Sequence, residues 1–115
     1  MSTPSEIKKL IERLDRELTF TEQETREGIN LLRPLISRFP DNLRLIRFFS
    51  LLNNILLFVE ISRRRIQAII ERVSISDVTA EEIQESGEDL SSLLGQVLDT
   101  KIEVVTTIEV LRKLQ

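Results

Sequence analysis

The chain has 115 residues, a net charge of −3, and no cysteine, histidine, tryptophan or tyrosine. Without cysteine there is no disulfide or thiolate chemistry, and without histidine the usual neutral-pH general base and commonest metal ligand are missing. The three glycines, at positions 28, 87 and 95, do not cluster, so no phosphate-binding loop is expected. We therefore expect one domain, residues 1–115, that is not an enzyme and has no catalytic residue, cofactor or metal.

Apolar residues spaced along one helical face predict a first helix from about residue 4 to residue 38. Thr3 and Glu6 form a capping box at its start. Thr21 to Glu24 form a second one, which makes a break near residues 19–21 an alternative. Pro34 lacks the N–H of a helical residue and clashes with the preceding turn, so a kink is expected near it.

A turn at residues 39–42 precedes a second helix that we expect to run to about Val73, capped by Asp41. Its main apolar face is accompanied by a second apolar set on other sides of the helix. A helix that is apolar nearly all round is buried on several sides. The second set is therefore our candidate self-association surface, for a homodimer. It consists of Leu43, Ile46, Leu51, Leu57, Phe58 and Ile61.

Residues 43–61 are the stretch closest in composition to a membrane span, but they include Arg44, Arg47 and Glu60. Because a charge near the centre of a bilayer costs about 2.5 kcal/mol or more, we expect a buried helix and no membrane partner. Residues 1–5 are polar and no short apolar core follows, so no signal peptide is expected. The lack of cysteine fits a cytoplasmic protein.

Residues 74–78 are expected to connect to a third helix that begins with a capping box at Thr79 to Glu82. Residues 102–110 also alternate as a strand would, but no second strand-like segment exists to pair with them. Three helices of similar length with short turns predict an all-α, antiparallel up-down-up bundle of coiled-coil type.

The charges are divided unevenly along the chain. Residues 33–72 carry eight arginines and three acidic groups, whereas residues 73–115 carry nine acidic and three basic groups. If the chain reverses near Ser76, the arginines of residues 63–72 face the acids of residues 80–89. We therefore expect ion pairs within the chain, with Arg63 bound to Glu88 or Asp89, or to acids one turn away from them. The same register places Lys101 near Leu51 and Asn53.

Binding of nucleic acid by the arginine-rich second helix is the alternative function, because guanidinium groups suit phosphate. Against it, the pI is about 5.1 and no aromatic residue is interleaved with the arginine run, so nucleic acid is not the expected partner. The candidate contacts are Arg44, Arg47, Arg63, Arg64, Arg65 and Arg72.

Gly87, Ser91 and Gly95 form a strip of small residues at four-residue spacing. Tight packing inside the monomer is the expected use of this strip, and a contact between chains is the alternative. The acidic residues 81–89 are expected to form a solvated face rather than a cation site.

The length and three-helix topology resemble those of spectrin-like repeats, although the tryptophan usual in those repeats is absent. We assign no family from the sequence. The function expected is that of a protein–protein interaction, scaffold or regulatory protein that associates with itself.

Overall fold

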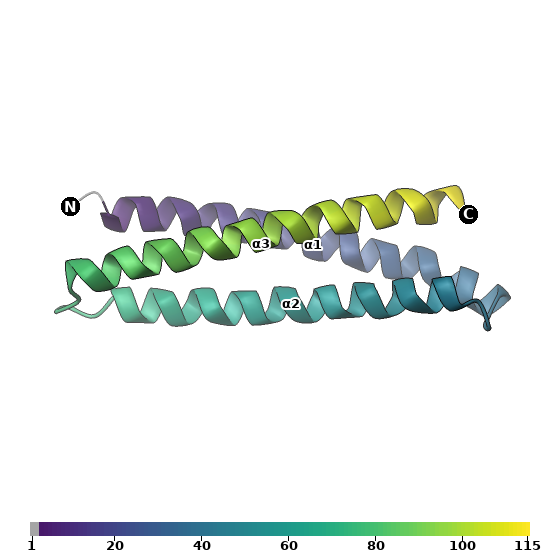
Figure 1. Ribbon diagram of the computed structural model, residues 1–115, viewed down its shortest axis with the longest axis horizontal. Coiled ribbons are helices and arrows are strands. Elements are labelled where there is room, and N and C mark those ends of the chain that lie inside the picture. Colours follow the sequence, from purple (N-terminus) through teal and green to yellow (C-terminus); the bar gives the residue numbers. More distant parts are fainter. Residues whose placement is uncertain (1–2) are drawn as a thin grey trace.

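The computed structural model describes residues 3–115, which contain three helices and no strand. Helix α1 spans Thr3–Arg38, α2 spans Leu43–Val73 and α3 spans Ala80–Lys113. They lie side by side in up-down-up order and form a rod of 58 × 18 × 16 Å (Figure 1). The predicted all-α three-helix bundle is confirmed, and helices account for 89% of the residues described.

Side-chain caps set the starts of the second and third helices. Thr79 Oγ1 accepts a hydrogen bond from the Glu82 N–H at 3.1 Å, as the capping box predicted. Asn42 Oδ1 accepts one from the Leu45 N–H at 3.1 Å, so the cap of α2 is Asn42 and not Asp41 as expected. Asp41 instead belongs to the turn. The cap expected at Thr3 involves a side chain outside the described part of the chain.

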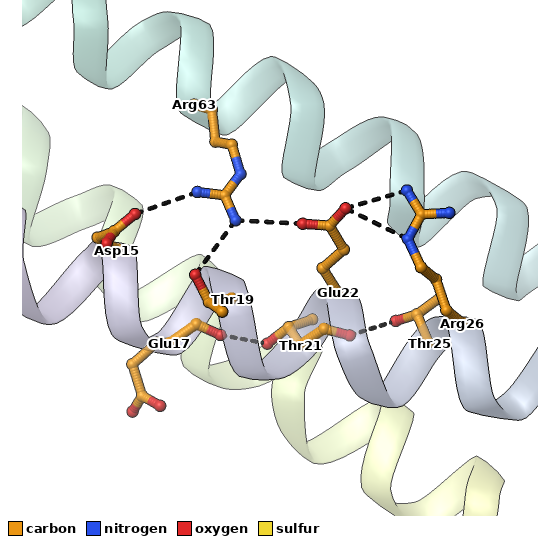
Figure 2. Close-up of polar contacts among 8 residues, drawn as sticks. All are labelled: Asp15, Glu17, Thr19, Thr21, Glu22, Thr25, Arg26 and Arg63. Carbon is orange, nitrogen blue, oxygen red and sulfur yellow. Dashed lines mark hydrogen bonds and ion pairs between the residues drawn. The ribbon is translucent and has the colours of Figure 1, made fainter.

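Helix α1 is continuous through residues 19–21, so the alternative of a break there is wrong. Thr21 is fully buried, and its hydroxyl donates to the Glu17 carbonyl at 2.7 Å (Figure 2). Thr25 repeats the arrangement one turn later, donating to the Thr21 carbonyl at 2.6 Å. Both hydroxyls are satisfied by the helix backbone, so Thr21 does not need to act as a cap. The helix also continues past Pro34 to Arg38.

The core lies along the inner face of α1, which packs against both other helices. Its contact with α3 is the most extensive in the molecule, and the contact between α2 and α3 is the least. Between Leu18 and Ile29 the buried positions of α1 carry only small residues, which are Thr21, Thr25 and Gly28. A Cβ atom on Gly28 would lie 3.0 Å from Leu52 of α2 and 3.4 Å from Ile108 of α3. Gly28 therefore marks the point where all three helices approach closely.

Because α2 has little contact with α3, it buries only one side. Its buried residues are Leu45, Leu52, Ile55, Val59, Ser62, Ile66 and Ile69. These positions recur every three, four or seven residues and define a single stripe. The opposite side of the helix is left to solvent, contrary to the expectation of a helix buried on several sides.

Replacing Gly28 with Leu should lower the free energy of unfolding by about 1–3 kcal/mol, because the added side chain overpacks the contact with Leu52 and Ile108. Gly95 is the matched control, since nothing lies within 4 Å of a Cβ atom added there. Gly95→Ala should raise stability by about 0.5–1 kcal/mol through helix propensity alone. Urea unfolding measures both changes. Shifts in the same direction would contradict the close approach at Gly28.

Candidate interaction surface

Helix α2 presents aliphatic side chains to solvent on the side opposite its core contacts, which we call the outer face. The large residues that mark it are Leu43, Ile46, Leu57 and Ile61, which are 66%, 40%, 53% and 45% exposed. The remaining exposed residues between Leu43 and Ile61 include the uncharged polar residues Ser50, Asn53 and Asn54. The outer face is thus neither a purely apolar patch nor an ordinary charged helix surface.

Two of the six candidate self-association residues do not belong to this face. Leu51 is half-buried and packs against a cluster formed by Ile55, Val104 and Ile108. Phe58 is half-buried and packs against the core near the other end of the bundle. The sequence placed these two residues with the exposed set because they lie off the main stripe. The structure shows that they instead widen the buried side.

The outer face continues into an open groove near the start of α2. The groove has a volume of about 470 Å³ and lies between the end of α1 and the beginning of α2. Its lining consists of Arg33, Ile36, Ser37, Ile46 and Phe49. Ile46 belongs to both the groove and the outer face, so the apolar surface extends from α2 toward the last turns of α1.

Arg63 joins the middle of α2 to α1 through a polar network. Its guanidinium donates to Asp15 at 3.2 Å, to the Thr19 hydroxyl at 3.3 Å and to Glu22 at 3.2 Å (Figure 2). Arg26 donates to the other carboxylate oxygen of Glu22 at 3.0 Å. These bonds from Arg26 and Arg63 lower the pKa of Glu22 below its ordinary value, although partial burial opposes them.

The prediction that Arg63 pairs with Glu88 or Asp89 is therefore wrong. It assumed that α2 and α3 pack as a simple hairpin. The contact of α2 with α1 is, however, more extensive than its contact with α3. Only the last turns of α2 reach the acids of α3, where Arg72 lies 3.6 Å from Asp89. Basic side chains of α2 and α3 do pair with acidic groups inside the chain, as expected, but most of these acids lie on α1.

The six arginines considered for nucleic-acid binding are only partly available. Arg63 and Arg72 form the ion pairs described above, and Arg64 pairs with Glu60 one turn earlier on α2. Arg44 lies over the ring of Phe48, 5.4 Å from its centroid. Arg47 and Arg65 are exposed, and no ion pair is found for them within residues 3–115.

Lys101 makes its polar contacts with α1. Its ammonium group is 2.9 Å from a Glu17 carboxylate oxygen and 4.9 Å from the centroid of the Phe20 ring. The ammonium group of Lys101 thus lies at the edge of the bundle, away from the apolar stripe of α3, and forms an ion pair with Glu17 there.

The strip of small residues on α3 does not serve tight packing inside the monomer, which corrects the expectation. Nothing lies within 4 Å of a Cβ atom added at Gly87 or Gly95, and Ser91 is exposed. The strip therefore lies on open surface. The neighbouring acidic residues of positions 81–89 are also exposed, and no metal-binding group of three side chains occurs in residues 3–115.

By length and composition alone, α2 is apolar enough to cross a membrane. Only 28% of its most apolar stretch is buried within the bundle. However, Leu52, Ile55 and Val59 of this helix contribute to the core. Inserting α2 alone would expose the apolar faces that α1 and α3 now bury against it.

Comparison with known proteins identifies no matching family model, no similar curated protein and no similar solved structure.

Removing the Arg63 network should destabilise the bundle. Arg63→Ala breaks two ion pairs and a hydrogen bond to α1, and should lower the free energy of unfolding by on the order of 1 kcal/mol. Arg16→Ala, at an exposed site of α1 with no ion pair within residues 3–115, is the matched control and should change stability little. Chemical denaturation at neutral pH measures both; equal effects would contradict the role of the network.

The difference in unfolding free energy between the wild type and Arg63→Ala should also depend on pH. Glu22 has a lowered pKa in the folded state, so the unfolded chain binds the proton first on acidification. The stability that Glu22 contributes is thus complete above the ordinary carboxyl pKa and is lost as pH falls through its lowered folded-state value. The stability gap between the wild type and Arg63→Ala should shrink over that range. A gap that is constant with pH would show that Glu22 is not involved.

Proposed function

We propose that the protein is a non-enzymatic helical interaction protein that associates with itself, as a homodimer, through the outer face of α2. The observation that supports this most is the exposure of four large aliphatic side chains on one side of a single helix. Each such side chain left in water forgoes about 1.5–3 kcal/mol of burial. Large apolar side chains gathered on one exposed face and interspersed with polar ones are typical of a contact site between proteins.

A scaffold or regulatory role agrees better with the polar groups than catalysis does. Proton transfer at neutral pH needs a group whose pKa lies near 7. Glu22, which lines a hollow between α1 and α2 together with Glu60, has its pKa lowered, and so moved away from 7, by Arg26 and Arg63. At neutral pH Glu22 is therefore ionised, and its bond to Arg63 joins α1 to α2.

The cytoplasm is the compartment that we propose for this association. A chain free of cysteine needs no oxidising environment, and an apolar face covered by a second copy needs no lipid. Helix α2 is rich in apolar residues, yet only 28% of its most apolar stretch is buried in the bundle. A second copy of the chain on its outer face would bury more of this surface.

Binding of nucleic acid is a weaker candidate for the same region. Of its six arginines, Arg63, Arg64 and Arg72 already have acidic partners within the chain. Release of counterions would make any such binding strongly dependent on salt. We therefore expect passage through a heparin column without retention at low salt. Retention that is lost on adding salt and is abolished by Arg47→Ala with Arg65→Ala would favour the nucleic-acid function instead.

Sedimentation tests the self-association directly. The wild type should sediment as a dimer at micromolar concentration, and Leu57→Arg should give a folded monomer, because Leu57 lies on the outer face and outside the core. The matched control is Ile102→Arg, at a residue on α3 that is 65% exposed. This control should remain a dimer. A wild type that sediments as a monomer would overturn the proposal.

Phe58 is not suited to this test. Because its ring packs on the core, Phe58→Arg should destabilise the fold whether or not the protein dimerises. Circular dichroism of Leu57→Arg should show unchanged helicity, which separates loss of association from unfolding.

A further inference from the structure

The outer face carries two rows of residues in which each member lies seven positions from the next. One row is formed by Leu43, Ser50, Leu57 and Arg64, and the other by Arg47, Asn54, Ile61 and Ala68. All eight are exposed. Between the rows the spacing alternates between four and three residues, as it does along the seam of a two-stranded coiled coil. The apolar members of the two rows are Leu43, Leu57, Ile61 and Ala68. In heptad terms the first row occupies d positions and the second row a positions.

The core contacts of α2 fall outside both rows. Leu45, Leu52, Val59 and Ile66 occupy f positions, opposite the seam, and Ile55, Ser62 and Ile69 occupy b positions beside them. The same helix can therefore pack in the bundle on one side and pair with a second helix on the other. Neither contact has to be broken to make the other.

We propose that two copies of the chain pair through their α2 helices as a parallel two-stranded coiled coil. This inference rests on the proposed self-association and adds its orientation and register. In a parallel pair each residue of the seam meets the same residue of the second copy. Asn54 therefore meets Asn54, Leu57 meets Leu57 and Ile61 meets Ile61.

The residue types at the centre of the seam are those that favour two parallel strands. A β-branched residue at a with leucine at d favours a parallel dimer, and here Ile61 and Leu57 occupy these positions. A single asparagine at an a position fixes register and the number of strands. Asn54 occupies such a position, and its side chain is free of any hydrogen bond to the described residues of its own chain.

The flanking charges select the same orientation. In a parallel pair, each residue at g faces the residue five positions later, at e, on the second copy. Along α2 these pairs are Ile46 with Leu51, Asn53 with Phe58, Glu60 with Arg65, and Gln67 with Arg72. One pair is oppositely charged and none joins like charges, while Leu51 and Phe58 remain packed in their own bundle. Arg65, which forms no ion pair within residues 3–115, gains an acidic partner in Glu60 of the second copy.

An antiparallel pair would be less favourable electrostatically. It sets the e row of one helix against the e row of the other, and that row includes Arg44, Arg65 and Arg72. Like charges placed across an interface are destabilising. The two arginines within the seam itself, Arg47 and Arg64, lie toward its ends, where long side chains can lay their stems on the seam and keep their charge in water.

Cysteine cross-linking tests the orientation, because the chain has no cysteine of its own. Leu43→Cys introduces a thiol at the first residue of α2, where the side chain is 66% exposed. In a parallel pair the two thiols meet at one end of the seam, and mild oxidation should convert most of the protein to a disulfide-linked dimer. Ile102→Cys on α3 is the matched control and should remain monomeric under denaturing conditions.

The outcomes separate this inference from the proposed function. Failure of Leu43→Cys to cross-link, in a variant that still sediments as a dimer, overturns the parallel orientation and leaves self-association intact. Sedimentation of the wild type as a monomer overturns both.

A charge exchange tests the register. Glu60→Arg should weaken dimerisation about fivefold or more, and Glu60→Arg with Arg65→Glu should restore it, since the pair is rebuilt with opposite sign. Glu60→Gln serves as control for loss of the Glu60–Arg64 bond within one chain. It should weaken dimerisation less than Glu60→Arg does. A double variant no tighter than Glu60→Arg alone would contradict the pairing of Glu60 with Arg65.

Discussion

The packing of α1 against both other helices is the contact on which the rest of the structure depends. Its inner face is narrow at mid-length, where Thr21, Thr25 and Gly28 replace the large residues found toward each end. The narrow section lets α2 and α3 approach α1 closely, with Leu52 and Ile108 in contact distance of Gly28. Buried surface is thereby concentrated on α1, and the contact between α2 and α3 stays small.

The exposure of α2 is a direct result of this unequal division. A helix held equally by two neighbours would bury a wide face. Helix α2 instead buries one stripe, and the half-buried residues Leu51 and Phe58 lie along the edge of that stripe. The charges follow the same pattern. Arg63, Lys101 and Arg112 reach from α2 and α3 to carboxylates of α1, at Glu22, Glu17 and Glu27. The helix with the most extensive contacts thus also supplies most of the counter-charges, and the outer face of α2 remains open for the partner proposed above.

The extent of the helices could be predicted closely from sequence, because periodicity and caps are local signals. The end of α1 at Arg38, the end of α2 at Val73 and the cap at Thr79 all follow from residues within one turn. The misplaced cap at Asp41 is an error of one residue between two side chains with equal capping ability. At Thr21, the hydroxyl could either cap a new helix or bond back to the preceding turn, and only burial against α3 and α2 decides between them.

The contacts between helices could not be predicted in the same way. The pairing of Arg63 with Glu88 came from treating α2 and α3 as an isolated hairpin, and that register says nothing about a third helix. Gly28 and Gly95 are both glycines inside helices, yet one lies at the closest approach of three helices and the other faces open space. Composition within the helix does not distinguish them. The outer face was anticipated as a surplus of apolar residues, but which of them are exposed depends on where α1 and α3 lie.

The packing of α1 against α3, the first and last helices of the chain, affects how the protein folds. Lys101 and Glu17 are separated by 84 positions, and Arg112 and Glu27 by 85, although each pair is in contact. The largest buried surface therefore forms only after nearly the whole chain has been brought back on itself, and the entropy of closing that loop is lost before the contacts compensate for it. Folding should accordingly be slower than in helical proteins whose main contacts join neighbouring helices. Until α3 docks, a nascent α1–α2 hairpin exposes the apolar face of α1 to solvent and to other unfinished chains.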